Sequence, residues 1–275
     1  DHYLNKPLEL YLFIDPMCPE CWSFEPIIKK LTIEYGHYFK LRPIITGSLT
    51  SSYNPTPAFI REKINYWDAT AKTTGMSCNP DYWLENPETS PWFASLAIKA
   101  AELQGQRAGN RYLRKLREYL FLKKRNISEK ETLLEIAERV NLDLEEFHID
   151  LHSKAAKEAL LGDLNLTREM GVEQTPTIVI FNREDEYDGL KVSGTFDYNV
   201  YEGALMEVTD DHISPSIPPE LEQFLEQHKV VTTKEVSFVF DYSMKNAERE
   251  LLKLLFKNRV ERVPAKYGSF WKYVY

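Results

Sequence analysis

The sequence predicts an α/β protein with a long helical insertion, and three observations support this prediction. Leu8–Asp15 has the β-forming residues and alternation of a strand, and apolar residues at helical spacing follow up to Gly36. A second strand pattern begins at Tyr38, which indicates a βαβ unit with parallel strands and a right-handed crossover. Helical periodicity then fills residues 55–165, and strand-rich sequence returns at Thr177–Asn182.

Local signals refine the insertion and the region after it. Ser128, followed three residues later by Glu131, has the spacing of a capping box at a helix start. Residues 183–189 (REDEYDG) have the composition of a turn, and residues 190–196 (LKVSGTF) predict a further short strand. The sheet is therefore expected to combine strands from both sides of the insertion.

A proline-rich stretch at residues 210–222 divides the chain. Pro215, Pro218 and Pro219 lie in it, and it has little periodicity, which is typical of an extended linker. We therefore predict three parts: a first domain at residues 1–210, a linker at 211–221 and a second domain at 222–275.

The predicted second domain has the element order of a winged helix. One short helix ends near His228, and a second begins after Thr232 or Thr233. A third helix is amphipathic, with its apolar residues along one side: Ala247, Leu251, Leu254 and Leu255. A hairpin around residues 265–268 follows it. The domain is therefore expected to be winged-helix-like.

Composition limits the classes of function. The 275 residues are 43% hydrophobic, enough for one sizeable core and a small second one, and they carry a formal charge of −8. Nucleic acids and anionic membranes require cationic surfaces, and no apolar run approaches the roughly 20 residues of a membrane span. With three cysteines and no secretory signal, the chain is expected to be cytoplasmic. The sequence begins with Asp1 and not with Met, so it does not define the native N-terminus.

The C-terminal region has a different charge balance. From residue 233 to 275, nine Lys or Arg face five acids, a local charge of about +4. Glu248 and Glu250 on the third helix would repel phosphate groups, however, and winged helices also bind proteins. Nucleic acid is therefore not the predicted partner.

Two short motifs predict a thioredoxin-like fold. Cys18 and Cys21 lie where the first strand meets its helix, and a helix N-terminus stabilises the thiolate of the first cysteine. Thr175–Pro176 precedes the later strand, and a proline there is a candidate cis peptide bond. In a thioredoxin-like fold this loop faces the cysteines. The helices must then be an insertion between the two motifs.

The sequence leaves three roles open for the dithiol. Glu20, between the two cysteines, is expected to raise the Cys18 pKa by about one unit at an effective dielectric of ~40. That effect favours a weakly active or vestigial pair over an efficient catalyst. Structural zinc is the third role, but it needs four ligands, so Cys78 or a histidine would have to complete the site.

Two further groups are weaker candidates. His148 and His152 are four residues apart on a predicted helix and could share a metal, although such a pair in a charged helix is more often solvated. Cys78, in an aromatic-rich loop, is expected to be an inert or partly buried thiol.

The residues DPMCPECW (15–22) and TPT (175–177) resemble the DsbA-like branch of the thioredoxin fold, whose helical insertion matches the one predicted here. The whole chain, including NAERELLKLL and GSFWKY near its end, resembles the YjbH family. The resemblance implies an adaptor that presents the transcription factor Spx to the ClpXP protease. Such a protein would not be an enzyme, would need no cofactor or metal, and would act by binding.

The resemblance leaves Cys18 and Cys21 as at most a redox sensor, with Pro176 opposite them. No motif assigns the partner-binding face, and the helical insertion is one candidate for it. The other candidate is the set of residues around the dithiol: Met17, Pro19, Trp22 and Thr175. ClpXP would be contacted directly or only through Spx. The alternative function is a cytosolic thiol-disulfide oxidoreductase that uses the same two cysteines.

Overall fold

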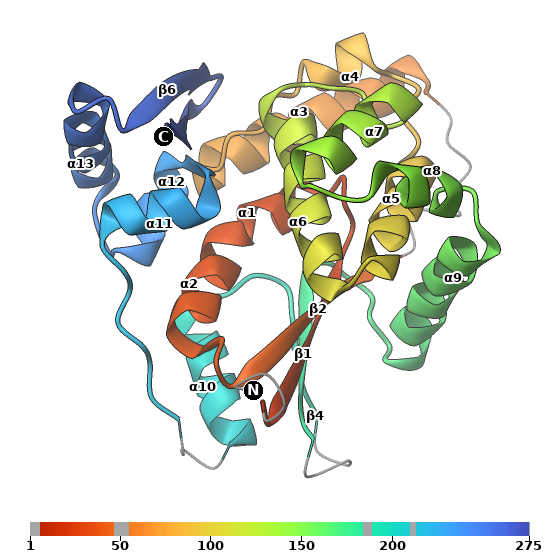
Figure 1. Cartoon of the computed structure of the whole chain (residues 1–275), viewed down its shortest axis with the longest axis horizontal. Helices are drawn as coiled ribbons and strands as arrows, with labels where there is room; N and C mark the ends of the chain where they lie inside the picture. The colour runs from red at the N-terminus through yellow and green to blue at the C-terminus, as the bar shows by residue number, and fades with distance from the viewer. Residues whose placement is uncertain (1–5, 47–54, 184–188, 210–212, 275) are drawn as a thin grey trace.

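A four-stranded sheet in the order β2-β1-β3-β4 forms the centre of the larger part of the protein (Figure 1). The computed structural model describes residues 6–46, 55–183, 189–209 and 213–274. The strands are β1 (Leu8–Ile14), β2 (Phe39–Ile45), β3 (Thr177–Asn182) and β4 (Gly189–Ser193). β1 and β2 run parallel, as predicted, whereas β3 pairs antiparallel with both β1 and β4. Strands on both sides of the insertion therefore share one sheet.

The alternation within β1 separates the two faces of the sheet. Leu8, Leu10 and Leu12 are buried in the main core with residues of α2 (Glu25–Tyr35). Phe13 faces the other side, where the end of α9 (Lys154–Glu169) contributes Leu166. The short helix α1 (Pro19–Ser23) lies between β1 and α2, and it carries the dithiol.

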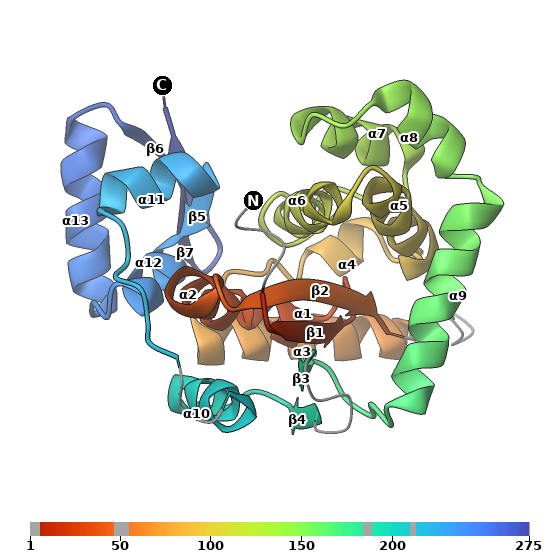
Figure 2. The same cartoon turned by 60° about the horizontal axis from the view of Figure 1, so that its bottom comes forward.

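The insertion is helical, as predicted, and it surrounds the end of the sheet at which α1 begins (Figures 1 and 2). Its elements before α9 are α3 (Pro57–Thr74), α4 (Tyr82–Glu85), α5 (Pro91–Leu103), α6 (Gln106–Arg117), the π-helical turn η2 (Glu118–Leu122), α7 (Lys130–Arg139) and α8 (Leu144–Asp150). Side chains that accept hydrogen bonds from the first turn cap α3, α5, α8 and α9: Thr56, Ser90, Asp143 and Ser153.

The predicted capping box at Ser128 and Glu131 is wrong. The N-cap of α7 is Glu129, whose side chain makes no capping hydrogen bond. The Ser128 hydroxyl instead accepts from the backbone N–H of Ser90 and donates to the carbonyl of the same residue. A tertiary contact has therefore replaced the local cap, because Ser128 lies beside the start of α5.

The segment after β4 leads to the C-terminal part. α10 (Tyr198–Val208) packs on β3 and α2. Residues 213–220 have no helix or strand and run as an extended connection, held where Ser216 donates its backbone N–H to the carbonyl of Glu34 (Figure 1). Most of the turn predicted at 183–189, and the first residues of the predicted linker, lie outside the described residues.

The C-terminal part has its own sheet and its own hydrophobic cluster. Its elements are α11 (Leu221–His228), β5 (Val230–Thr232), α12 (Thr233–Val239), α13 (Met244–Phe256), β6 (Val260–Ala265) and β7 (Gly268–Tyr273), with strand order β5-β7-β6. The cluster includes Phe224, Leu251 and Trp271. Thr232 caps α12 in a capping box, and the hairpin occurs where it was predicted. The short strand β5 was not predicted.

No helix within the described ranges is both long and apolar enough to cross a membrane.

Candidate functional site

The dithiol turn has the geometry that the sequence predicts. Cys18 is the N-cap residue of α1, and its backbone N–H donates to the carbonyl of Asp15 at 3.1 Å. Cys21 lies within α1, and both cysteines are free thiols. The Thr175–Pro176 bond is cis, and Thr175 lines the same cavity as Cys18. The two motifs, about 155 residues apart, therefore come together.

The two thiols have opposite pKa shifts. The hydrogen bond between the sulfurs lowers the pKa of Cys18, against its burial and the nearby carboxylate of Asp15, which raise it. Burial raises the pKa of Cys21 well above its ordinary value, and the neighbouring Cys18 adds to the shift. Of the two thiols, Cys18 therefore loses its proton more readily than Cys21.

Glu20 lies close to the dithiol. Its side chain is exposed, and its backbone N–H lowers the pKa of Cys18. Its carboxylate accepts a hydrogen bond from Tyr66, and burial, with the charges of Cys18 and Glu20, raises the pKa of that hydroxyl. The carboxylate that opposes ionisation of Cys18 most directly is Asp15, which precedes the turn. The effect expected from the Glu20 charge on Cys18 stays a prediction.

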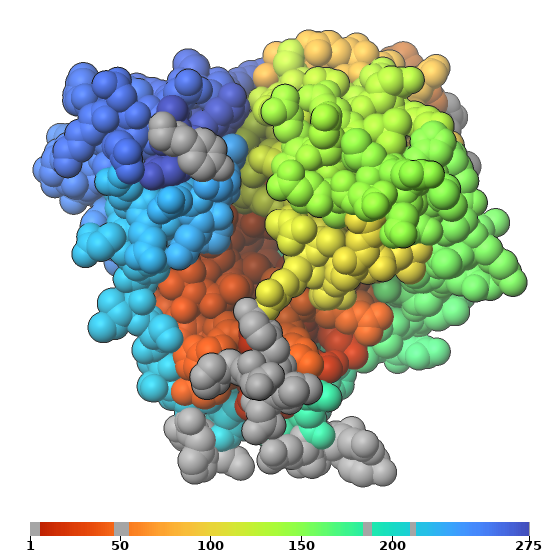
Figure 3. All heavy atoms as spheres, viewed as in Figure 1, coloured from red at the N-terminus to blue at the C-terminus, as the bar shows by residue number. Residues whose placement is uncertain are grey.

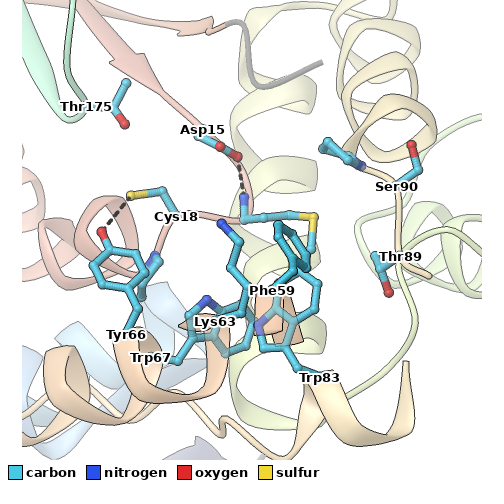
Figure 4. Close-up of a pocket in the computed structure, with 13 residues that line it drawn as sticks. Asp15, Cys18, Phe59, Lys63, Tyr66, Trp67, Trp83, Thr89, Ser90 and Thr175 are labelled. Atoms are coloured by element: carbon cyan, nitrogen blue, oxygen red, sulfur yellow. Dashed lines mark hydrogen bonds between the residues drawn. The ribbon is translucent and has the colours of Figure 1, made fainter. Parts of the chain in front are cut away.

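A cavity of about 300 Å³ opens beside Cys18 (Figure 4). One wall comes from the dithiol turn, with Met17 and Pro19, and from Thr175 of the cis-proline loop. The other wall comes from the helical insertion: Phe59, Lys63, Tyr66, Trp67, Trp83, Thr89, Ser90 and Pro91. The sequence left the dithiol face and the insertion as separate candidates for partner binding. In the fold they are two walls of the same cavity.

Trp22 does not belong to this cavity, so its predicted exposure on a binding face is wrong. The ring is 0% exposed, its Nε1 donates to the carbonyl of Ser77 at 2.9 Å, and it stacks on Phe121. The guanidinium of Arg114 lies 4.8 Å from the ring centroid. Trp22 points away from the sulfurs because helix α1 rotates consecutive side chains onto different faces.

The zinc alternative finds no ligand set in the described part of the chain, where no three His, Cys, Asp or Glu side chains come together as a metal site would require. Cys78 is buried, its thiol donates to the carbonyl of Trp67, and burial raises its pKa to about 12. His148 and His152 are exposed, with ring centroids 6.2 Å apart.

A second group of residues, which the sequence did not reveal, joins the C-terminal part to the rest of the molecule. Glu235 of α12 is fully buried, and it accepts from Lys29 of α2 at 2.7 Å and from Arg114 of α6 at 3.0 Å. Arg114 also pairs with Glu25 of α2 at 3.1 Å. We call this group of four residues the seam.

The charges of the seam stabilise each other. Burial alone would raise the pKa of Glu235, but Arg114 and Lys29 hold it well below its ordinary range. A groove of about 200 Å³ runs beside the seam between α2, α6 and α11, and it is visible between the C-terminal part and the insertion in Figure 3. His228 lines it, and burial, with Lys29, lowers the pKa of His228 to about 3.

The tip of the C-terminal hairpin makes a further contact with the insertion. Lys266 pairs with Asp81 at 3.2 Å, and the Tyr267 hydroxyl donates to Asp68 of α3. On α13, Lys253 pairs with Glu250 at 2.8 Å. Cationic side chains of this region therefore make ion pairs within the chain.

Comparisons with known proteins define the class first. A family model described as thioredoxin matches residues 11–203. A putative protein disulfide isomerase from Nitrosomonas europaea superposes with a TM-score of 0.64 at 18% identity, over 75% of this chain and 99% of its own. Cytosolic disulfide reductase DsbM from Pseudomonas aeruginosa superposes with a TM-score of 0.56 at 18% identity, over 74% of this chain and 95% of its own. The chain has the DsbA-like thioredoxin fold.

Closer relatives identify the family. ClpXP adapter protein SpxH of Bacillus subtilis strain 168 is 47% identical over 270 residues, which cover 98% of this chain and 90% of the relative. SpxH of Bacillus cereus strain ATCC 10987 is 40% identical over 275 residues, covering 98% and 92%. The chain belongs to this family of ClpXP adapter proteins, the YjbH family that the sequence resembles.

Proposed function

We propose that the chain is a cytoplasmic adaptor that binds the transcription factor Spx and promotes its degradation by the ClpXP protease. The observation that carries this proposal is the 40–47% identity, over 98% of the chain, to relatives named as ClpXP adapter proteins SpxH. The C-terminal part supports it, because thiol-disulfide exchange at Cys18 needs no residue from α11 to β7. Adaptor binding is therefore the main activity that we assign.

An adaptor of this kind acts through binding alone. When it holds its partner and the protease takes up the partner's exposed segment, the local concentration of that segment rises and degradation accelerates. No bond is made or broken by the adaptor itself. Direct contact with ClpXP is not required for this mechanism, so Spx is the partner that the proposal names first.

The cavity at Cys18 is the surface that we propose for partner binding. It combines Met17 and Pro19 of the dithiol turn with aromatic side chains of α3, among which Tyr66 is 37% exposed. Aromatic residues beside a partly apolar hollow are typical of the residues that carry binding energy at protein interfaces. Trp22 contributes indirectly, since its buried ring packs α1 against Phe121 of the insertion.

The test is a purified degradation reaction with ClpXP and Spx. Adding catalytic amounts of the chain should accelerate the loss of Spx while the chain itself persists. Replacing both Cys18 and Cys21 by Ala should leave most of the acceleration, since the proposed mechanism uses their surroundings and not their redox chemistry. A degradation rate that stays at its adaptor-free value would contradict the proposal.

The lowered pKa of Cys18 favours one second candidate, a thiol-disulfide oxidoreductase. That activity requires turnover of a disulfide substrate that Cys18→Ala abolishes. If the reduction rate of such a substrate equals the rate without protein, this candidate is excluded.

A further inference from the structure

Helix α3 has two faces that meet different parts of the protein. Its inner face lines the cavity at Cys18 with residues that share one side of the helix by their spacing (Figure 4): Phe59, Lys63, Tyr66 and Trp67. Asp68 comes nine residues after Phe59, which is about two and a half helical turns, so it lies on the opposite face. A group that contacts Asp68 therefore holds this wall of the cavity from the outside.

The C-terminal hairpin makes this contact. The hydroxyl of Tyr267, in the turn between β6 and β7, donates to Oδ1 of Asp68. Lys72, one helical turn further along α3, pairs with Oδ2 of Asp68 at 2.6 Å, and its ammonium lies 6.0 Å from the centroid of the Tyr267 ring. The Tyr267 ring also packs against the main core. The turn of the hairpin is therefore joined to the outer face of α3.

The segment that follows α3 also contacts the C-terminal part. The buried sulfur of Met76 accepts from the hydroxyl of Thr232 at 3.2 Å. Asp81, which pairs with Lys266, is the N-cap residue of α4, and Trp83 of α4 lines the cavity. Both α3 and α4 therefore contact the C-terminal part through residues that lie outside the cavity lining.

The hairpin tip does not pack closely against the insertion. A hollow of about 390 Å³ lies beside it, lined by residues from both parts: Ser77, Asn79, Asp81, Leu122, Pro264, Ala265 and Lys266. The contact therefore depends on individual side chains, of which Tyr267 reaches α3 itself. Because the C-terminal part has its own hydrophobic cluster, loss of this hydrogen bond should shift α3 without unfolding that part.

We propose that Tyr267 is a positioning residue for the cavity at Cys18, and that it acts through Asp68 by fixing α3, so that Phe59 and Tyr66 keep their places in the wall. The consequence for Spx rests on the proposed function, because it assumes that Spx binds at the cavity. The C-terminal part then contributes to partner binding through α3 and not through contact with Spx. The seam has a different role, since its four residues lie on α2, α6 and α12.

The first experiment does not involve Spx. Cys18 Sγ lies 3.9 Å from the Tyr66 hydroxyl, so a shift of α3 changes the access to this thiol. Tyr267→Phe removes the hydroxyl and keeps the ring, and it should accelerate alkylation of Cys18 by iodoacetamide about threefold, measured by peptide mass. Asp68→Ala should have the same effect. Alkylation at the wild-type rate in both variants would overturn the proposal.

Conservative variants distinguish positioning from a general loss of structure. Asp68→Asn keeps a side-chain oxygen that can accept from Tyr267, and Lys72→Ala removes the ion pair of Asp68 but not its hydrogen bond. Both variants should alkylate within about twofold of the wild-type rate, because a partly exposed ion pair contributes little. If either variant reacted as fast as Asp68→Ala, the hydrogen bond from Tyr267 would not be what positions α3.

Spx affinity completes the test. Tyr267→Phe and Asp68→Ala should raise the Kd for Spx about fivefold in calorimetry, while their urea midpoints stay close to that of the wild type. Faster alkylation with an unchanged Kd would support the positioning role of Tyr267 and place Spx binding away from the cavity, against the proposed function. A raised Kd with an unchanged alkylation rate would mean that the hairpin contacts Spx itself, which would overturn the proposal.

Discussion

The seam and the cavity at Cys18 both join distant parts of the sequence, and they are built in opposite ways. At the seam, Glu235 meets Lys29 and Arg114, and the charges are buried and paired. At the cavity, Cys18 of the dithiol turn meets α3, and the space between them stays open. The charged groups of the seam pair with each other, whereas the cavity presents a half-buried thiol and a half-buried lysine to a binding partner.

This difference separates the structural joint from the binding surface. A buried charge whose partner is removed costs several kcal/mol, so the seam fixes the C-terminal part against α2 and α6. A half-open, partly apolar cavity costs little free energy when it is empty, and its apolar surface is buried when a partner fills it. Changes at the seam should therefore act mainly on stability, and changes at the cavity mainly on binding.

The largest expected effect is at the seam. Glu235→Ala leaves Arg114 and Lys29 with a missing buried partner and should lower the free energy of unfolding by about 3–5 kcal/mol, as is typical for one half of a buried ion pair. Denaturation in urea, followed by tryptophan fluorescence, measures it. Glu250→Ala, which removes a partly exposed ion-pair partner on α13, is the control and should change stability far less. Similar losses in both variants would mean that the seam does not hold the two parts together.

The cavity should respond in binding instead. Tyr66→Ala should weaken Spx binding by about 1–2 kcal/mol, or roughly tenfold in Kd, without a matching loss of stability. Phe256→Ala removes an aromatic ring that is 82% exposed at the end of α13 and serves as the matched control for the other face. Calorimetry with purified Spx measures both. If Phe256→Ala lowered the affinity for Spx more than Tyr66→Ala, the binding surface would lie on the C-terminal part and not at the cavity.

Lowering the pH should destabilise the fold through His228, which lies beside the seam. His228 faces Lys29, Arg114 and Glu235, and its pKa in the folded chain, about 3, lies below the ordinary 6.5. The unfolded chain therefore binds more protons between these values, and stability falls as pH drops from about 6.5 towards 3. His228→Asn should reduce this loss by about 1 kcal/mol, given that the ring is half-buried. Thermal melts at pH 7 and pH 5 test it, and an unchanged difference between the two would contradict the assignment.

The smallest effect is expected at the hairpin tip. Lys266→Ala removes a partly exposed ion pair with Asp81, which should cost a few tenths of a kcal/mol, about the size expected for surface pairs. Melting of the variant at low and high salt measures it. A loss as large as that of Glu235→Ala would show that the tip, and not the seam, fixes the C-terminal part.

Sequence patterns predicted the elements well where interactions between residues close in the sequence determine the structure. The strand before Cys18, the cis bond at Pro176, the cap at Thr232 and the buried face of α13 are set by neighbours within a few residues. The errors at Ser128 and Trp22 share one cause. Each concerned which way a side chain points, and tertiary contacts decided it.

The sequence by itself determined the thioredoxin-like fold, the place of the dithiol and the helical insertion, because spacing and periodicity record these directly. Its residues also resemble those of an adaptor family. Only the tertiary structure decided that the dithiol turn and α3 form one cavity, and that Glu25, Lys29, Arg114 and Glu235 form the seam. Ion pairs and cavities depend on distances between residues that lie far apart in the sequence. A single sequence does not contain those distances until the sheet and the insertion have packed together.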